Sequence, residues 1–278
     1  MAGASELPQG SEPVELDPAE FTTEIDNPWW PMAVGSRWVY RETDSEGAEQ
    51  RVVVTVTPKT RRIANGVEAR VVHDVVTEDG VPTEVTDDWY AQDAAGNIWY
   101  LGEETTEYED GKPVSKTGSF EAGVDGAQAG VILPADPVPG LSYRQEHYAG
   151  EAEDEGEIVS VDAQVEAPFG HFKPALMTKD TNPLEPKVLE FKFYARDVGP
   201  VLATAVSGSS DREELISFEP GGMTGRPGLG ALSAVPDHPG SRRRPGRRQR
   251  RSSGPTDRAA APPPPEAQDR GTRPRRRG

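Results

Sequence analysis

The chain has 278 residues, no cysteine and a formal net charge of −17. Without cysteine it can form no disulfide, thiolate metal site or cysteine nucleophile, and it offers no cysteine for lipid attachment. No run of about 18 apolar residues is present, so we expect no transmembrane segment. The first residues also lack the basic start and apolar core of a signal peptide.

The charge is divided sharply between two parts of the chain. Beyond Gly221 there are 14 Arg, no Lys and 4 acidic residues, whereas the first 221 residues hold 16 basic and 43 acidic ones. Contacts to nucleic-acid phosphates are made mainly by Lys and Arg. We therefore expect no nucleic-acid partner for the acidic body.

The N-terminal region combines a polar leader with an aromatic segment. Residues 1–20 are acidic, contain Pro and Gly, and are predicted to form a disordered leader. In residues 21–32, Pro28 and Pro31 flank Trp29 and Trp30. This spacing excludes a helix, and the indole rings need a surface to cover. We predict an extended plug packed against a sheet, with stacking on a ligand as the alternative.

Short segments of alternating or β-branched residues recur from residue 36 onwards. The central segment, residues 85–127, has aromatic pairs on both sides of residues 93–97. This arrangement predicts a β-hairpin, and a left-handed Gly96 would bring Ala91 near Trp99. Other hairpin turns are predicted at Asn65-Gly66, Asp79-Gly80 and Asp110-Gly111.

The second half begins with a segment rich in glycine and proline. Residues 123–140 contain four glycines and three prolines, and they are predicted to form a loop that docks through residues 131–133. Strand patterns then resume. In residues 188–195, Leu189, Phe191 and Phe193 are predicted to point inward and the charged residues between them outward.

Together these patterns predict an all-β protein. The expected fold is a single antiparallel meander of about eleven or twelve strands that forms a curved sheet or a closed or half-open barrel. The folded domain would span residues 21–220, and residues 221–278 would form a disordered Arg/Pro-rich tail.

Three interpretations of this tail remain open. It is a tether to nucleic acid or another anionic surface, a flexible segment that neutralises the acidic body, or a frameshift or read-through product of GC-rich DNA. The absence of Lys beside 14 Arg favours the third interpretation.

The sequence contains no motif that specifies a reaction. The four histidines lack the spacing of a metal-binding pair, and no phosphate-binding loop or nucleophile elbow is present. We expect no cofactor, with Ca²⁺ held by Glu121, Asp125 and loop carbonyls as the one alternative.

Acidic residues are abundant in the body, and two facing carboxylates inside a barrel can act as acid and base in glycoside hydrolysis. The simpler interpretation places them on solvated strand faces, so we name no catalytic residue. The polar site candidates are Glu103, Glu121, Asp125, Arg144 and Glu146.

Aromatic residues in the first half of the meander are the main candidates for ligand binding, because a concave aromatic face can hold an apolar ligand or a carbohydrate. The alternative is that these rings form the core itself, since the chain has only seven Phe. The candidates are Trp38, Tyr40, Trp89, Trp99, Tyr100 and Tyr108.

Three segments resemble a family of uncharacterised bacterial proteins, mostly of actinobacterial type, that are exported or lipoprotein-like. They are residues 88–93 (DWYAQD), 96–103 (GNIWYLGE) and 118–127 (GSFEAGVDGA). The resemblance covers residues 21–218 and implies an extracytoplasmic location, but no activity. The chain departs from that family by lacking a signal peptide. At the level of the fold alone, the meander is also similar to LolA-type carriers and lipocalins.

The sequence therefore predicts a non-enzymatic, extracytoplasmic β-sheet protein. It would bind an apolar or amphipathic, lipid-like ligand on an aromatic concave face, with a carbohydrate as the other small molecule expected. One alternative is a carboxylate-dependent, glycosidase-like hydrolase. Another is a structural or partner-binding module of the envelope without a small ligand. The sequence does not indicate an oligomeric state.

Overall fold

The computed structural model describes residues 7–222, which form an all-β, antiparallel domain as the sequence predicts. Sixteen strands belong to one sheet, and five of them are only two to four residues long, which explains why the count exceeds eleven or twelve. One 3-10 turn, η1 (Pro18–Glu20), precedes the strands. The strands are β1 (Phe21–Thr22), β2 (Arg37–Thr43), β3 (Glu49–Arg62), β4 (Glu68–Glu78), β5 (Val81–Asp93), β6 (Ile98–Glu109), β7 (Lys112–Ser115), β8 (Phe120–Glu121), β9 (Gln128–Leu133), β10 (Ser142–Arg144), β11 (Glu146–His147), β12 (Glu155–Ala167), β13 (Gly170–Thr181), β14 (Leu189–Ala195), β15 (Gly199–Ser207) and β16 (Arg212–Glu219).

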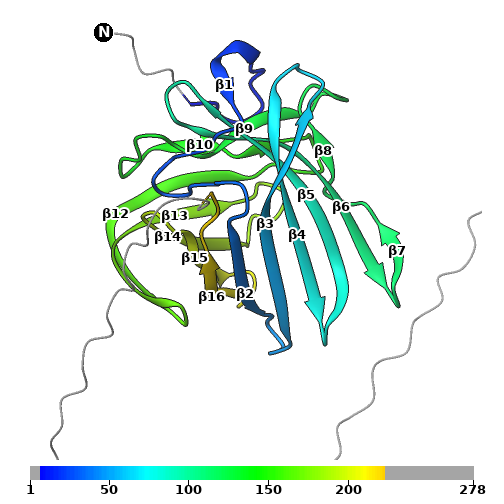
Figure 1. Ribbon diagram of the computed structural model, residues 1–278, viewed down its shortest axis with the longest axis vertical. Coiled ribbons are helices and arrows are strands. Elements are labelled where there is room, and N and C mark those ends of the chain that lie inside the picture. Colours follow the sequence, from blue (N-terminus) through cyan, green and yellow to red (C-terminus); the bar gives the residue numbers. More distant parts are fainter. Residues whose placement is uncertain (1–6, 223–278) are drawn as a thin grey trace, which may run out of the picture. The chain divides into compact units, whose positions relative to one another are not determined.

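The sheet is a meander that returns to its own beginning. From β2 to β6, and again from β12 to β16, each strand pairs with the next, and β16 pairs with β2. Figure 1 shows β2–β6 running along the length of the domain, with β12–β15 crossing them. The remaining two ends of the sheet meet in residues 142–147, which we call the closing segment. Here β10 pairs with β12 and β11 pairs with β9. The sheet is therefore a nearly closed barrel.

Gly130 in β9 permits this closure because it has no side chain. A Cβ atom at this position would lie 2.3 Å from the carbonyl carbon and oxygen of Gln145 and 2.5 Å from the carbonyl oxygen of Arg144. Cβ atoms do not approach backbone atoms this closely, so any other residue would push the closing segment away from β9.

The central hairpin forms where the sequence predicts it. Asp93 begins the turn, and its carboxylate accepts hydrogen bonds from the backbone N–H groups of Ala95 and Asn97 and from Nε1 of Trp99, at 2.8–2.9 Å. Gly96 has a φ of +95°, which glycine adopts without strain. Ala91 is paired with Trp99, which is the register that a left-handed Gly96 gives.

The tryptophan plug is also confirmed. Trp29 is buried, and the ring of Trp30 lies 5.6 Å from that of Tyr90 and 6.2 Å from that of Tyr194. Tyr90 and Tyr194 belong to opposite sides of the barrel, on β5 and β14. The tryptophan segment therefore packs between β5 and β14.

Residues 7–17, within the predicted leader, lack regular structure but lie along the barrel. The guanidinium of Arg144, only 1% exposed, donates to the carbonyl oxygens of Gly10 at 2.8 Å and Glu12 at 2.6 Å. Its other nitrogen donates to the carbonyl oxygen of Ala129 at 2.7 Å. One buried side chain thus connects the N-terminal segment, the closing segment and β9.

The expectation that residues 123–140 form a loop is wrong in its middle part. Residues 128–133 are β9, which pairs with β6 on one side and β11 on the other. Val131 and Leu133 are completely buried, so the predicted docking of this apolar stretch is correct. The glycines and prolines lie mostly in the flanking turns, and the one inside the strand, Gly130, serves the close approach described above.

We expect Gly130→Ala to destabilise the domain by about 3 kcal/mol, because the added methyl group overpacks the closure. Urea unfolding of the full chain measures this change. Gly170→Ala is the matched control, since a Cβ there would meet its nearest neighbour at 3.4 Å, an ordinary contact distance. Equal stability of the two variants would contradict the proposed role of Gly130.

Candidate functional site: the acidic interior of the barrel

The orientation of β14 differs from the sequence prediction and defines the site. The apolar residues Phe191 and Phe193 are half-buried, whereas Tyr194, on the opposite face, is only 1% exposed. Lys192 shares the face of Tyr194, and its Nζ lies 2.9 Å from Oδ2 of the buried Asp180. The prediction that charged residues of this strand point outward is therefore wrong. Alternation fails here because the interior itself contains charged groups.

Carboxyl groups and tyrosines line this interior, and they come from β2–β6 and from the later strands β10–β16. Lys192 is a basic residue among them, and its side chain is 32% exposed although Tyr194 beside it is almost fully buried. Solvent therefore reaches part of the Lys192 side chain. The lining carboxyl groups are Glu42, Asp74, Glu84, Asp88, Glu103, Glu146, Asp154, Asp180, Glu190 and Glu213, and the tyrosines are Tyr40, Tyr90, Tyr100, Tyr143 and Tyr194.

A tyrosine holds two of these carboxyl groups together. The hydroxyl of Tyr100 lies 2.8 Å from Oδ1 of Asp88 and 2.7 Å from Oε2 of Glu103. A tyrosine hydroxyl can donate only one hydrogen bond, so both contacts are satisfied only if one carboxyl group is protonated and donates to the tyrosine oxygen. Burial raises the pKa of both carboxyl groups, and the negative charge of Glu103 raises that of Asp88 further.

Asp74 is the least compensated carboxyl group of the interior. It lies on β4 inside the apolar stretch of residues 71–76, and its Oδ1 is buried without a hydrogen-bond partner among the described residues. Burial, followed by the negative charges of Glu213, Glu84 and Glu42, raises the pKa of Asp74 to about 8. Burial also raises the pKa of Glu213 to about 7.

A second group of ionisable residues lies near the closing segment. Burial and the neighbouring charge of Asp154 raise the pKa of Glu146 to about 9, and the two side chains are hydrogen-bonded to each other. Lys192 is close enough to lower the pKa of both. In this region the interior thus has a cation, whereas Asp74 has none beside it.

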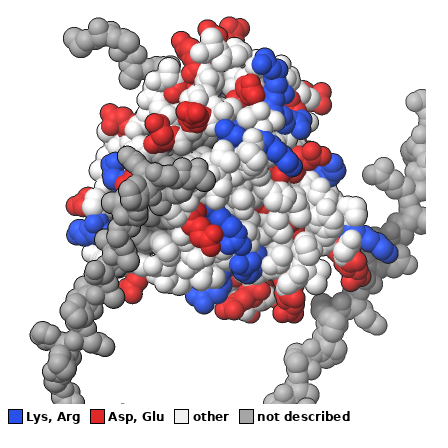
Figure 2. All heavy atoms as spheres, in the orientation of Figure 1, with Lys and Arg blue, Asp and Glu red and all other residues white. Residues whose placement is uncertain are grey.

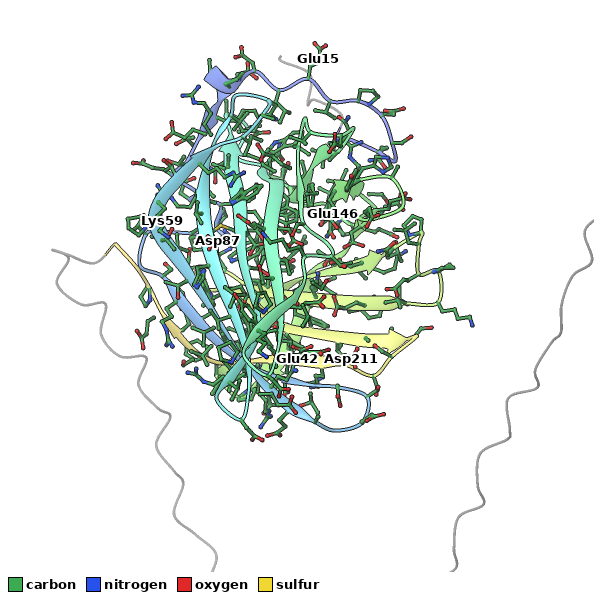
Figure 3. All side chains as sticks on the ribbon, turned by 90° about the vertical axis from the view of Figure 1, so that its right-hand side faces the viewer. Glu15, Glu42, Lys59, Asp87, Glu146 and Asp211 are labelled. Atoms are coloured by element: carbon green, nitrogen blue, oxygen red, sulfur yellow. The ribbon has the colours of Figure 1, made fainter. Side chains whose placement is uncertain are left out.

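One end of the interior opens into a hollow of about 430 Å³. Figure 3 shows Glu42 and Asp211 together at the lower end of the domain, with Glu146 further up. Figure 2 shows acidic side chains gathered along the same lower edge. The hollow is lined by Glu42, Gln50, Val76, Thr83, Glu84, Glu107, Tyr108, Glu109 and Val114.

The predicted aromatic candidates do not form one surface. Tyr40 and Tyr100 face the interior, and Tyr108 lies in the wall of the hollow. Trp38 is 1% exposed, and its Nε1 donates to the carbonyl oxygen of Val198. All of these except Tyr108 are buried.

Trp89 and Trp99 lie on the other face of β5 and β6, because they alternate with Tyr90 and Tyr100. The guanidinium of Arg61 covers the ring of Trp89 at 3.9 Å, and Phe21 packs edge-on against Trp99 at 5.9 Å. These two indoles are therefore packed outside the interior.

The polar candidates are also separated. Glu103 and Glu146 face the interior, whereas Arg144 binds backbone carbonyls. Glu121 accepts hydrogen bonds from Arg61 and from the backbone of Ala64, both at 2.7 Å. Asp125 is exposed in a turn with a φ of +49°.

Glu121 and Asp125 are the residues on which a Ca²⁺ site was considered. Within residues 7–222, no group of three or more His, Asp or Glu side chains could hold a metal ion. In the same residues, no helix is long and apolar enough to cross a membrane.

Sequence reasoning missed most of the interior groups, although a signal exists for one of them. Asp74 stands inside a β-branched run, where a carboxylate is costly unless it serves a purpose. The others are ordinary in sequence because charged residues in strands usually face solvent. The missed residues are Glu42, Asp74, Glu84, Asp180, Glu190, Lys192 and Glu213.

The fold and the site together define a nearly closed antiparallel β-barrel with an acidic, tyrosine-lined interior. No protein-family model and no curated protein matches the chain. Among solved structures, it is similar to a "putative lipoprotein" from Parabacteroides distasonis ATCC 8503, with 12% identity, a TM-score of 0.38, and coverage of 69% of this chain and 98% of that one.

It is also similar to a "putative exported protein with YmcC-like fold" from Bacteroides fragilis NCTC 9343. There the identity is 13% and the TM-score 0.39, with coverage of 69% of this chain and 99% of the other. At these TM-scores neither likeness carries an argument about function.

We expect the free energy of unfolding to fall by several kcal/mol between about pH 5 and pH 9. A carboxyl group whose pKa is raised by folding binds more protons in the folded state, so its contribution is complete below the ordinary pKa and is lost as the pH rises to the folded value. Asp74, Glu213 and Glu146 all act in this direction, with folded pKa values of about 8, 7 and 9. Urea unfolding across this pH range measures the slope.

Asp74→Asn should make this slope shallower, because one of the titrating groups is removed. Asp125→Asn is the matched control and should leave the slope unchanged, because Asp125 is exposed in a turn. Stability that rises from pH 5 to pH 9 would contradict the raised pKa values.

Proposed function

We propose that this protein is a non-enzymatic binding protein that takes a small amphipathic molecule into the barrel through the hollow at its lower end. The observation that carries the proposal is the hollow of about 430 Å³ that leads toward an interior of tyrosines and carboxyl groups. Ligand sites in β-barrels commonly lie in the mouth and interior.

The lining favours an amphipathic ligand over a purely apolar one. Val76, Val114 and the ring of Tyr108 offer apolar contact, while four glutamates share the same wall. An alkane-like molecule would displace water from these carboxyl groups without offering them hydrogen-bond partners, which is energetically unfavourable. A molecule with one polar end satisfies both parts of the surface.

An extracytoplasmic location belongs to the same proposal. It rests on the resemblance of residues 21–218 to exported and lipoprotein-like bacterial proteins. Fractionation of the native host, followed by detection of the full chain, tests the location separately from ligand binding.

Hydrolysis is a second candidate, favoured by one observation. Glu146 and Asp154 form a hydrogen-bonded carboxyl pair, and the raised pKa of Glu146 keeps a proton available near neutral pH. A protonated carboxyl group beside an ionised one can supply the acid and the base of a hydrolysis, as in the carboxyl dyad of aspartic proteases. Two of the polar candidates, Glu121 and Asp125, lie outside the interior.

If the barrel is a hydrolase, the wild type should cleave members of a chromogenic glycoside panel, and Glu146→Gln should lower the rate at least about a hundredfold by removing the acid. Glu151→Gln, at an exposed residue close by in the chain, is the control. The absence of cleavage by the wild type would contradict this candidate.

For the binding function, we expect Tyr108→Ala to weaken binding of the neutral fluorescent amphiphile N-phenyl-1-naphthylamine about tenfold, because a ring in the wall of the hollow is lost. Trp89→Phe should leave binding unchanged, since Trp89 lies on the other face. Fluorescence titration of the full chain measures both. No probe binding by the wild type, or equal binding by wild type and Tyr108→Ala, would contradict the proposal.

A further inference from the structure

Asp74 lies directly inward of the hollow. Val76 lines the hollow, and Asp74 is two residues earlier on the same strand and therefore on the same face. Glu42 and Glu84 also line the hollow, and both act on the charge of Asp74. Asp74 therefore lies next to the lining residue Val76 on the inner face of β4, although it is not itself part of the lining.

Among the described residues, the basic side chains of the interior are already held by other partners. Lys192 is already held by Asp180 at 2.9 Å and by Glu190 at 3.4 Å. The buried guanidinium of Arg70 donates to the carbonyl oxygens of Thr23, Thr57 and Lys59, and that of Arg144 likewise binds carbonyls. None of these three cations pairs with Asp74.

An unused hydrogen-bonding atom is the second and independent observation. Oδ1 of Asp74 is buried with no hydrogen-bond partner among the described residues. Unsatisfied buried polar atoms are rare in native proteins and call for a partner.

The tyrosines around this point suit a cation as well. Tyr40 and Tyr90 both lie close to the charge of Asp74, and Tyr90 stacks on Tyr100 with ring centroids 5.0 Å apart. Aromatic faces attract ammonium groups, most strongly where water is scarce. Lys192, held between two carboxylates in the same interior, is an example of an ammonium group that this environment already accepts.

We propose that the ligand is a primary alkylamine, or a molecule with such a group, and that its ammonium donates a hydrogen bond to Oδ1 of Asp74 while its apolar part lies in the hollow. This inference rests on the proposed binding function and adds the chemical class of the ligand. The ammonium supplies both the donor that Oδ1 lacks and the positive charge that the surrounding carboxyl groups lack.

The test compares three probes of equal chain length, n-decylamine, n-decanol and n-decanoate, by calorimetric titration of the full chain at about pH 8.5, where Asp74 is largely ionised. We expect the amine to bind at least tenfold more tightly than the alcohol, and decanoate to bind most weakly. Asp74→Asn should remove the preference for the amine while leaving alcohol binding intact. Asp125→Asn, in an exposed turn, should change neither affinity.

The outcomes separate the two proposals. If decanol binds as tightly as decylamine, or if Asp74→Asn keeps the preference, the amine inference is wrong and the binding function stands. If no probe binds, both are wrong. Glu213→Gln, which removes a neighbouring carboxyl group, provides a second variant if Asp74→Asn fails to fold. A weaker preference for decylamine over decanol in this variant would support the role of the negative charge.

Protonation supplies an additional readout. Because the pKa of Asp74 is raised to about 8, this carboxyl group holds a proton in the empty site at neutral pH. Binding of the amine should release that proton. The affinity should therefore rise about tenfold per pH unit below about pH 8 and level off above it. Titrations in buffers of different ionisation enthalpy count the protons released, and zero release would overturn the assignment of the ammonium to Asp74. The groups that face Asp74 and share this titration are Glu42, Glu84, Asp88, Glu213, Tyr40 and Tyr90.

Discussion

The structure depends on how a barrel can enclose so many carboxyl groups. Moving an ionised carboxylate out of water is very costly unless a cation or several hydrogen bonds compensate it. This interior offers three solutions side by side. Asp180 has Lys192, Asp88 and Glu103 share a proton through Tyr100, and Glu42 and Glu84 stay at the open end near solvent. The raised pKa values, the tyrosine contacts and the open hollow are three consequences of one electrostatic constraint.

The same constraint explains why the walls are secured from outside. A polar interior contributes less hydrophobic stabilisation than a packed one, so other regions supply it. The tryptophan plug covers one end, Trp89 and Trp99 pack on the outer face, and β9 buries Val131 and Leu133 beside the closing segment. Arg144 then fixes that segment to the N-terminal residues through main-chain carbonyls. The outer face of the strands therefore supplies much of the hydrophobic stabilisation, while the inner face carries the polar groups.

The fold was accessible from sequence because its signals are local. The turn at residues 93–97, the proline-flanked tryptophans and the recurring strand patterns each depend on neighbouring residues, and each was confirmed. The site could not be predicted in the same way, because the alternation of apolar and polar residues shows only that a strand has two faces and does not say which face is inside. For β14 it assigned the phenylalanines to the inside, and the barrel placed Lys192 there instead. The aromatic candidates are divided in the same way, since Trp89 and Tyr90 are adjacent in sequence and lie on opposite faces. Which carboxyl groups meet across the interior depends on pairing between strands more than a hundred residues apart.

The pairing of β2 with β16 has a consequence for synthesis on the ribosome. Arg37 is opposite Glu219, so the first long strand waits for almost the whole domain to be translated before its second edge is covered. Until then the growing chain carries a meander with a free edge, which is the kind of surface through which partly made β proteins associate. The last eight-residue strand therefore decides whether the nascent chain ends as a monomeric barrel or remains open to pairing with its neighbours.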